Sequence, residues 1–189
     1  MPAVVLLTLV PMAPESWFEA PSWTYLVAIA VGSAIFVQLS NLYERRVQKR
    51  VASKYHLLAE SGDAIAMCYL GLFYKAGAKG LRRDDEQAVR WLRRAAASGD
   101  GMAMYHLGLY YDKGDAGLPQ AGVEALNWYL KAANAGSTSA MNNIGYLYEY
   151  GACGVTRDNS EARNWYAKAA NLGNTLALEN LELLQQKHD

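Results

Sequence analysis

One phrase occurs three times in this chain, as AMCYLGLFYKAG at 66–77, AMYHLGLYYDKG at 103–114 and AMNNIGYLYEYG at 140–151. The copies follow one another at a constant step of 37 residues. Tryptophan recurs on the same step, at Trp91, Trp128 and Trp165. A fixed period of this length is typical of solenoids, in which short supersecondary units stack on one another. The repeat therefore predicts an all-α solenoid of helix pairs.

The repeated phrase predicts the first helix of each unit, over 63–75, 100–113 and 137–150. Its shared positions fall on one helical face. A glycine inside a helix costs ~1 kcal/mol relative to alanine, so its recurrence at Gly71, Gly108 and Gly145 needs a reason. We expect the partner helix to approach closely there. The later glycines of the phrase, Gly77, Gly114 and Gly151, are expected to end these helices as C-caps.

The second helix of each unit has a common frame of three small residues and a tryptophan, Ala88, Trp91, Ala95 and Ala96 in the first copy. The alanines allow close packing, and the tryptophan is expected to fill the space that they leave. Asp84, Asp85 and Asp158 are expected to cap these helices at their N-termini. Each connecting loop carries a glycine followed by an apolar residue, which we expect to fasten the loop to the helices: Leu81, Leu118 and Val155.

These patterns predict a repeat domain over 62–189. Its units cover about 63–99, 100–136 and 137–173, and a capping helix follows over 174–186. The capping helix begins with apolar residues in the repeat register and becomes polar toward its end, as the last helix of a solenoid does.

The N-terminal part of the chain has a different composition. No charged residue lies between Glu19 and Glu44, and Trp23–Leu39 is almost continuously apolar. About 20 apolar residues suffice for a helix to cross a bilayer, and aromatic residues favour its edges. We therefore predict a transmembrane helix over 21–43, in preference to a buried helix of a soluble protein.

Basic residues follow the predicted span closely: Arg45, Arg46, Lys49, Arg50 and Lys54. Because basic flanks stay on the cytoplasmic side, we expect a single-pass protein of the inner membrane with its repeats in the cytosol. The segment 44–61 is then a basic juxtamembrane helix, and 1–20 is a short non-cytosolic tail. A second apolar run, Ala3–Met12, is too short to span and is either a retained segment or the remnant of a leader.

The composition argues against several functions. Eighteen basic residues balance eighteen acidic ones, so no net charge favours nucleic acid. Two cysteines are too few for a disulfide framework or a cysteine-based metal site. We find no phosphate-binding loop, GxSxG or HExxH motif, and we expect no enzyme, cofactor, metal or small-molecule substrate. A basic face in the first unit is more simply a solvated surface than a site for acidic partners or phospholipid: Arg82, Arg83, Arg90, Arg93 and Arg94.

The repeated residues resemble the Sel-one-like repeat, a branch of the tetratricopeptide-type solenoids. The resemblance rests on the A-M-x-x-L-G-x-x-Y-x-x-G first helix, the glycine-apolar loop and the A-x-x-W-x-x-x-A-A-x-x-G second helix, and it covers 62–184. It implies a right-handed α-solenoid whose groove holds proteins or peptides. The predicted membrane anchor lies outside the family pattern.

The groove implied by the resemblance is lined by the varying positions of the first helices. Tyrosine and charged residues are good anchors in interfaces. Our candidate partner-binding residues are Tyr105, Asp112, Asn142, Tyr146, Glu149 and Tyr150. The alternative is that these side chains pack between helices or simply face solvent.

Together, these features predict a membrane-anchored scaffold or adaptor that binds a protein partner in its groove. The alternative is an immunity or inhibitor protein that blocks a toxic secreted enzyme, such as a lipase effector, at the envelope, because some bacterial members of the family look like this. That role favours repeats outside the cytosol, so the topology of the chain separates the two hypotheses.

Overall fold

The computed structural model describes residues 22–187, and it describes the side chains of 30–152 and 154–187. The chain divides into two compact parts, an N-terminal part, Met1–Arg46, and a C-terminal part, Val47–Asp189. Helix α1 (Ser22–Glu60) contains the described residues of the N-terminal part and the beginning of the C-terminal part. The predicted tail at 1–20 and the apolar run at 3–12 lie outside the described residues.

The predicted transmembrane helix falls in the N-terminal part of the chain, Met1–Arg46. No helix among the described residues is both long enough and apolar enough to cross a membrane. The predicted span 21–43 extends beyond this range, because residue 21 and the side chains of 22–29 lie outside it.

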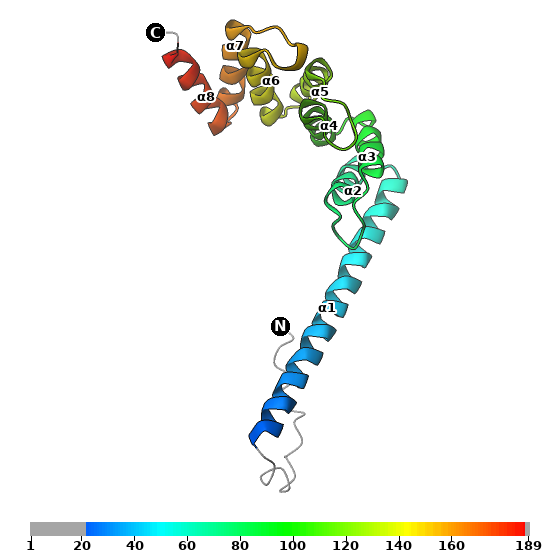
Figure 1. Cartoon of the computed structure of the whole chain (residues 1–189). Coiled ribbons are helices and arrows are strands. Elements are labelled where there is room, and N and C mark those ends of the chain that lie inside the picture. Colours follow the sequence, from blue (N-terminus) through cyan, green and yellow to red (C-terminus); the bar gives the residue numbers. More distant parts are fainter. Residues whose placement is uncertain (1–21, 188–189) are drawn as a thin grey trace. The chain divides into compact units, whose positions relative to one another are not determined.

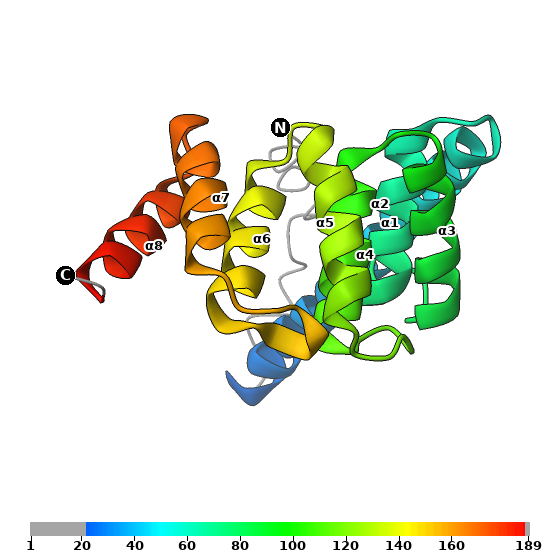
Figure 2. The same cartoon turned by 90° about the horizontal axis from the view of Figure 1, so that it is seen from above.

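The helices of the C-terminal part stack in chain order, and residues 22–187 contain no strand (Figures 1 and 2). Helices α2 and α3, α4 and α5, and α6 and α7 pack as pairs, and each pair also contacts the next. This arrangement confirms the predicted all-α solenoid. After the end of α1 the helices are α2 (Ala64–Ala76), α3 (Asp85–Ala97), α4 (Gly101–Lys113), α5 (Gly122–Asn134), α6 (Thr138–Tyr150), α7 (Asn159–Asn171) and α8 (Thr175–Gln186), with a 3₁₀ turn, η2, at Ala152–Gly154.

The first helices of the units begin and end as the sequence predicts. Asp63, Asp100 and Ser137 are the N-caps of α2, α4 and α6, and each side chain accepts a hydrogen bond from a backbone N–H. The C-cap glycines Gly77 and Gly114 have φ values of 63° and 65°. This left-handed conformation is costly for residues with a Cβ, which explains why glycine recurs there.

The mid-helix glycines make room for the second helices. A Cβ on Gly108 would lie 2.5 Å from Tyr129 Cδ1, and one on Gly145 would lie 2.6 Å from Tyr166 Cδ1. At Gly71 the nearest atom would be Leu92 Cγ, at 2.9 Å. The close approach that we predicted is therefore confirmed.

We expected the tryptophan of each second helix to fill the space that its alanines leave, and the burial of this residue differs between the units. Trp91 is buried, but Trp128 and Trp165 are only half-buried. The residue after each tryptophan is fully buried in all three units, and it is this residue that faces the glycine. The half-buried indoles each lie under a cation three residues later, with Lys131 Nζ 4.3 Å from the Trp128 ring centroid.

The end of α1 completes the core at its N-terminal edge. Ala59 is buried, and Tyr55 and Leu58 pack against the same cluster. The Tyr55 ring lies 5.2 Å from that of Phe73, and His56 Nε2 lies 2.9 Å from the Tyr74 hydroxyl. The last turns of α1 thus cover α2 in the place of the second helix of a preceding unit.

Candidate interaction surfaces

The exposed sides of α2, α4, α6 and α8 carry apolar side chains at equivalent repeat positions. Met102 is 47% exposed, Tyr146 48% and Leu176 55%. We call this surface the first-helix face and define it by two positions of the repeat. One position holds Ile65, Met102, Ser139 and Leu176, and the other holds Leu72, Leu109, Tyr146 and Leu183. Leu72 and Leu109 also pack against the core, whereas the other apolar members of the face are exposed. Exposed apolar side chains that recur at equivalent positions are typical of an interaction surface.

A cleft of about 510 Å³ lies on this face, between the N-terminal ends of α4 and α6. Met102, Tyr105 and His106 form its α4 side, and the turn 135–137 and Ser139 form the other. Burial lowers the pKa of the His106 imidazole, against the attraction of Asp100. The cleft therefore combines apolar and aromatic surface with a neutral histidine, a mixture that suits a protein segment.

The structure brings Tyr146 and Tyr150 together on α6. Their ring centroids are 4.6 Å apart, and both side chains are exposed. Tyr105 lines the cleft and lies 6.0 Å from the Tyr129 ring. These three of the six predicted site residues are accessible to a partner.

Two other predicted residues, Asn142 and Glu149, are built into the fold instead. Both are 6% exposed. Asn142 Oδ1 accepts a hydrogen bond from Asn180 on α8 at 2.9 Å. Glu149 accepts one from the Tyr166 hydroxyl at 2.9 Å and another from Lys187 Nζ at 2.8 Å. In this arrangement they attach α8 to the third unit, which corresponds to the packing alternative that the sequence left open.

The electrostatics of Glu149 follow from these contacts. Burial alone would raise the pKa of its carboxyl, but the hydrogen bonds from Lys187 and Tyr166 outweigh burial and hold the pKa below its usual value. The same environment raises the pKa of the Tyr166 hydroxyl. Glu149 is therefore ionised at neutral pH, with its charge directed at α8.

The sixth predicted residue, Asp112, is half-buried. The Tyr129 hydroxyl donates to it over a long distance of 3.4 Å, and no cation within the described residues forms a salt bridge with it. Burial raises the pKa of this carboxyl, and Tyr129 and Lys113 only partly oppose the shift. Asp112 thus belongs partly to the fold and partly to the surface.

Several residues of the first-helix face are absent from the six candidates, although Met102 and Ser139 lie at varying positions that the resemblance places in the groove. Met102, His106 and Ser139 line the cleft, and Leu176 and Leu183 extend the face onto α8. The signal was present, because these residues lie on the 37-residue step. Apolar residues at such positions, however, look like core residues until the packing is known.

The described residues offer little for chemistry. No group of three or more histidine, cysteine, aspartate or glutamate side chains among them could hold a metal ion. Cys68 is buried, and burial raises the pKa of its thiol to about 12. That thiol is therefore a poor nucleophile at neutral pH.

The chain matches known proteins along its repeats. A family model described as Sel1 repeat matches residues 64–100, 101–137 and 138–174. No curated protein matches the chain. A Sel1 repeat protein from Oxalobacter formigenes has a similar crystal structure, with 38% sequence identity and a TM-score of 0.63. That match covers 70% of this chain and 98% of the other.

Two further structures are similar. One is c5321, a protective antigen of uropathogenic Escherichia coli strains with an SLR fold, at 32% identity and a TM-score of 0.66. The match covers 70% of this chain but only 28% of c5321. The other is the Helicobacter pylori cysteine rich protein B, at 20% identity and a TM-score of 0.56, which covers 72% of this chain and 96% of that protein. The last likeness bears on the fold alone.

Proposed function

The chain belongs to the Sel1 repeat family, and on this premise we propose that it is an interaction scaffold whose first-helix face binds a segment of a partner protein. Sel1 repeat proteins are generally protein-interaction scaffolds, and the fold is generally not enzymatic. The observation that carries the proposal is the recurrence of exposed apolar side chains on α4, α6 and α8 at equivalent positions.

The chemistry of the face suits a partner with apolar or aromatic anchors. Tyr146 and Tyr150 offer two adjacent rings, and tyrosines are enriched among interface residues with large binding contributions. The cleft beside Met102 and Tyr105 can accept one side chain of the partner. Asn142 and Glu149 support the face from beneath, because they hold α8 in position.

Photocrosslinking tests this proposal. A photoreactive amino acid at Met102 or at Tyr146, in the full chain expressed in cells, should give an adduct with the same partner from both positions. Arg163 is exposed on α7, a second helix that carries none of the residues defining this face, and serves as the matched control position. An adduct formed equally well from Arg163, or none from either test position, would contradict the proposal. With the partner in hand, Met102→Ala combined with Tyr146→Ala should weaken binding by about tenfold or more.

We also propose that residues 21–43 anchor the chain in a membrane, with the repeats in the cytosol. The support is the uncharged stretch between Glu19 and Glu44, followed by the basic cluster that begins at Arg45. In the described part of this stretch, large apolar side chains point to solvent all along the helix: Val31, Ile35, Phe36, Leu39 and Leu42. These side chains lie on one side of the helix, and the stretch before Glu44 carries no charged residue. Both features favour burial in lipid or in another protein.

Two measurements test the anchor. The full chain should stay in the membrane fraction after alkaline carbonate extraction, and the double variant Val31→Arg with Ile35→Arg should be released. For topology, Glu124→Cys in a chain with Cys68→Ala and Cys153→Ser should react with a membrane-impermeant thiol reagent only after the cells are permeabilised. Reaction in intact cells would place the repeats outside the cytosol and favour the inhibitor of a secreted enzyme.

A further inference from the structure

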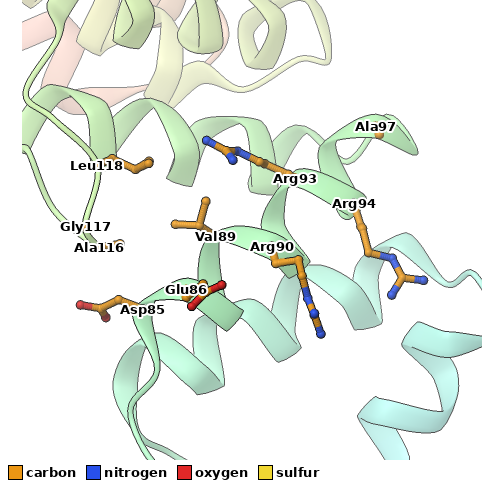
Figure 3. A pocket seen from close by; sticks show the side chains of 10 residues that line it. All are labelled: Asp85, Glu86, Val89, Arg90, Arg93, Arg94, Ala97, Ala116, Gly117 and Leu118. Atoms are coloured by element: carbon orange, nitrogen blue, oxygen red, sulfur yellow. The ribbon is translucent and has the colours of Figure 1, made fainter.

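We propose a second binding surface, a cleft on α3 that takes an acidic protein segment with one apolar anchor residue. Figure 3 shows this cleft, which has a volume of about 670 Å³. Its walls are α3 and the loop 116–118 that connects α4 to α5. We call it the arginine cleft. It shares no lining residue with the first-helix face, so the inference does not depend on the function proposed for that face.

The floor of the arginine cleft is apolar. Val89 and Ala116 are buried, and Leu118 is half-buried beside them. Together with Ala97 they offer a surface for one aliphatic or aromatic side chain. Removing such a side chain from water favours binding, so the floor distinguishes an anchored segment from a merely acidic one.

The rim is basic, and two of its three arginines are already held in place. Arg93 donates from Nη2 to the Tyr111 hydroxyl at 3.2 Å. The Arg94 guanidinium lies 4.4 Å from the centroid of the Trp91 ring. Arg90 has no ion pair within the described residues and is exposed. Figure 3 shows the arginines spreading from α3 on either side of Val89. Side chains held in advance lose less entropy on binding.

The acidic residues of the cleft lie at its other end. Asp85 is neutralised by Lys75 at 3.3 Å and by Arg83 at 3.0 Å. Glu86 is exposed and forms no salt bridge within the described part of the chain. Arg94 is also paired with Glu60 at 3.8 Å. The free positive charge of the lining therefore comes mainly from Arg90 and Arg93, and the N-terminal end of α3 is weakly negative. A ligand with an apolar residue followed by carboxylates complements this order.

The equivalent place one repeat later has lost these features. Arg90 and Arg93 correspond there to Asn127 and Leu130, and Glu86 corresponds to Val123. The loop that follows α6 contains η2, which packs against α5. In repeat proteins the shared residues maintain the scaffold, and the variable ones are free for recognition. Arg94 corresponds to Lys131, and each of these cations lies over a tryptophan ring, so this position belongs to the repeat. Arg90 and Arg93 have no basic counterpart there, which favours a role for these two in recognition of a ligand.

The chemistry favours a protein carboxylate over a phosphate-rich surface. Guanidinium groups bind carboxylates and phosphates in the same bidentate manner, so the arginines alone do not decide. The concave apolar floor favours a single inserted side chain. Glu86 at the rim would repel the continuous negative charge of an anionic membrane.

Fluorescence anisotropy with the full-length chain in nonionic detergent tests the inference. The probe is the labelled peptide Gly-Ser-Leu-Asp-Glu-Glu-Asp, and the matched control peptide has glycine in place of leucine. The leucine peptide should bind about tenfold more tightly than the glycine peptide. Arg90→Glu should weaken binding of the leucine peptide by about tenfold or more. Arg163→Glu, which reverses an exposed charge on α7, should change it by less than about twofold.

Each result bears on the arginine cleft alone. Unchanged binding in Tyr146→Ala would support a surface separate from the first-helix face. Equal affinity for the two peptides, or unchanged binding in Arg90→Glu, would overturn the inference. Soluble short-chain phosphatidylserine provides the lipid comparison. If it binds with the same dependence on Arg90 and the leucine peptide does not bind, the cleft is a lipid site and the inference is wrong.

Discussion

The second unit, 101–137, and the third, 138–174, share a scaffold but use one position differently. In each, a tyrosine of the second helix faces a glycine of the first and directs its hydroxyl at an acid four residues after that glycine. In the third unit this acid is Glu149, which is buried and hydrogen-bonded by Tyr166 and Lys187. In the second it is Asp112, which is half-buried and whose carboxylate accepts one side-chain hydrogen bond within the described residues, the long one from Tyr129.

The difference lies in what comes next along the solenoid. The third unit is followed by α8, and Glu149 attaches that helix through Lys187. The second unit is followed by a complete helix pair, α6 and α7, which shares a core cluster with α5. Asp112 forms no salt bridge to that pair within the described residues, so it has no such role. A scaffold position can therefore change from a residue that attaches the next helix to a partly exposed one while the tyrosine–glycine contact beside it is kept.

The shared part of the comparison predicts the largest effect. Gly108→Ala and Gly145→Ala should each destabilise the chain by about 2 kcal/mol. Overpacking against a buried ring costs ~1–3 kcal/mol, and the better helix propensity of alanine offsets only part of this. Urea unfolding followed by circular dichroism measures the change. Ser139→Ala, on an exposed position of α6, is the control and should stay within ~0.5 kcal/mol of wild type. Two neutral glycine variants would contradict the close approach.

The tyrosine hydroxyls should separate the two units. Tyr166→Phe removes the donor to a buried carboxylate and should cost ~1–2 kcal/mol. Tyr129→Phe removes a longer bond to a more exposed acid and should cost less than ~0.5 kcal/mol. The two variants are each other's controls in the same unfolding experiment. Equal losses would show that Asp112 is as deeply built into the fold as Glu149.

A third difference concerns the start of the second helix in each unit. Asp158 caps α7 through the backbone N–H groups of Ser160 and Glu161. Ala121 occupies the same place before α5, with similar backbone angles but no side-chain cap. Ala121→Asp should therefore stabilise the chain by ~1 kcal/mol, and Asp158→Ala should destabilise it by a similar amount. Thermal unfolding measures both. A stabilising Asp158→Ala would remove the capping argument.

The smallest expected effect is a pH dependence of opposite sign at the two acids. The pKa of Glu149 is lowered in the folded state, so its stabilising contribution is present above its unfolded pKa and is lost as the pH falls through the folded one. The pKa of Asp112 is raised, so its contribution is present at low pH and is lost as the pH rises through the folded pKa.

Glu149→Gln should therefore lower stability at neutral pH, and Asp112→Asn should raise it slightly. Each change should be below about 1 kcal/mol and should fade near pH 4. Urea unfolding at the two pH values measures it. If both variants shift stability in the same direction at neutral pH, the two acids do not differ in the way that the geometry indicates.

The fold was predictable in some detail because its determinants are local. Helix ends depend on capping residues such as Asp63 and Gly77, and these can be recognised from residue type and position. The tight contact at Gly108 was predictable because only a glycine that recurs inside a helix requires such a reason. The buried ring opposite it was not predictable, because Trp128 and Tyr129 are adjacent aromatic residues and either could have faced inward.

The candidate site was less predictable. Residues that vary between units are chosen either by a partner or by the next helix, and residue type does not separate the two. Tyr146 and Glu149 looked equally suited to a partner, yet one is exposed and the other is bonded to α8. The arginines of the first unit looked like an ordinary solvated face until the loop at 116–118 was seen to form a cleft with them.

The sequence by itself determined the period, the helix pairs, their caps and the family, since each follows from local conformational preference repeated at a fixed step. Only the tertiary structure decided which side chains remain on the surface. Exposure depends on the neighbour that each helix meets, and that neighbour is set by the packing of segments distant in the chain, such as Lys187 on Glu149 and Leu118 across from Val89.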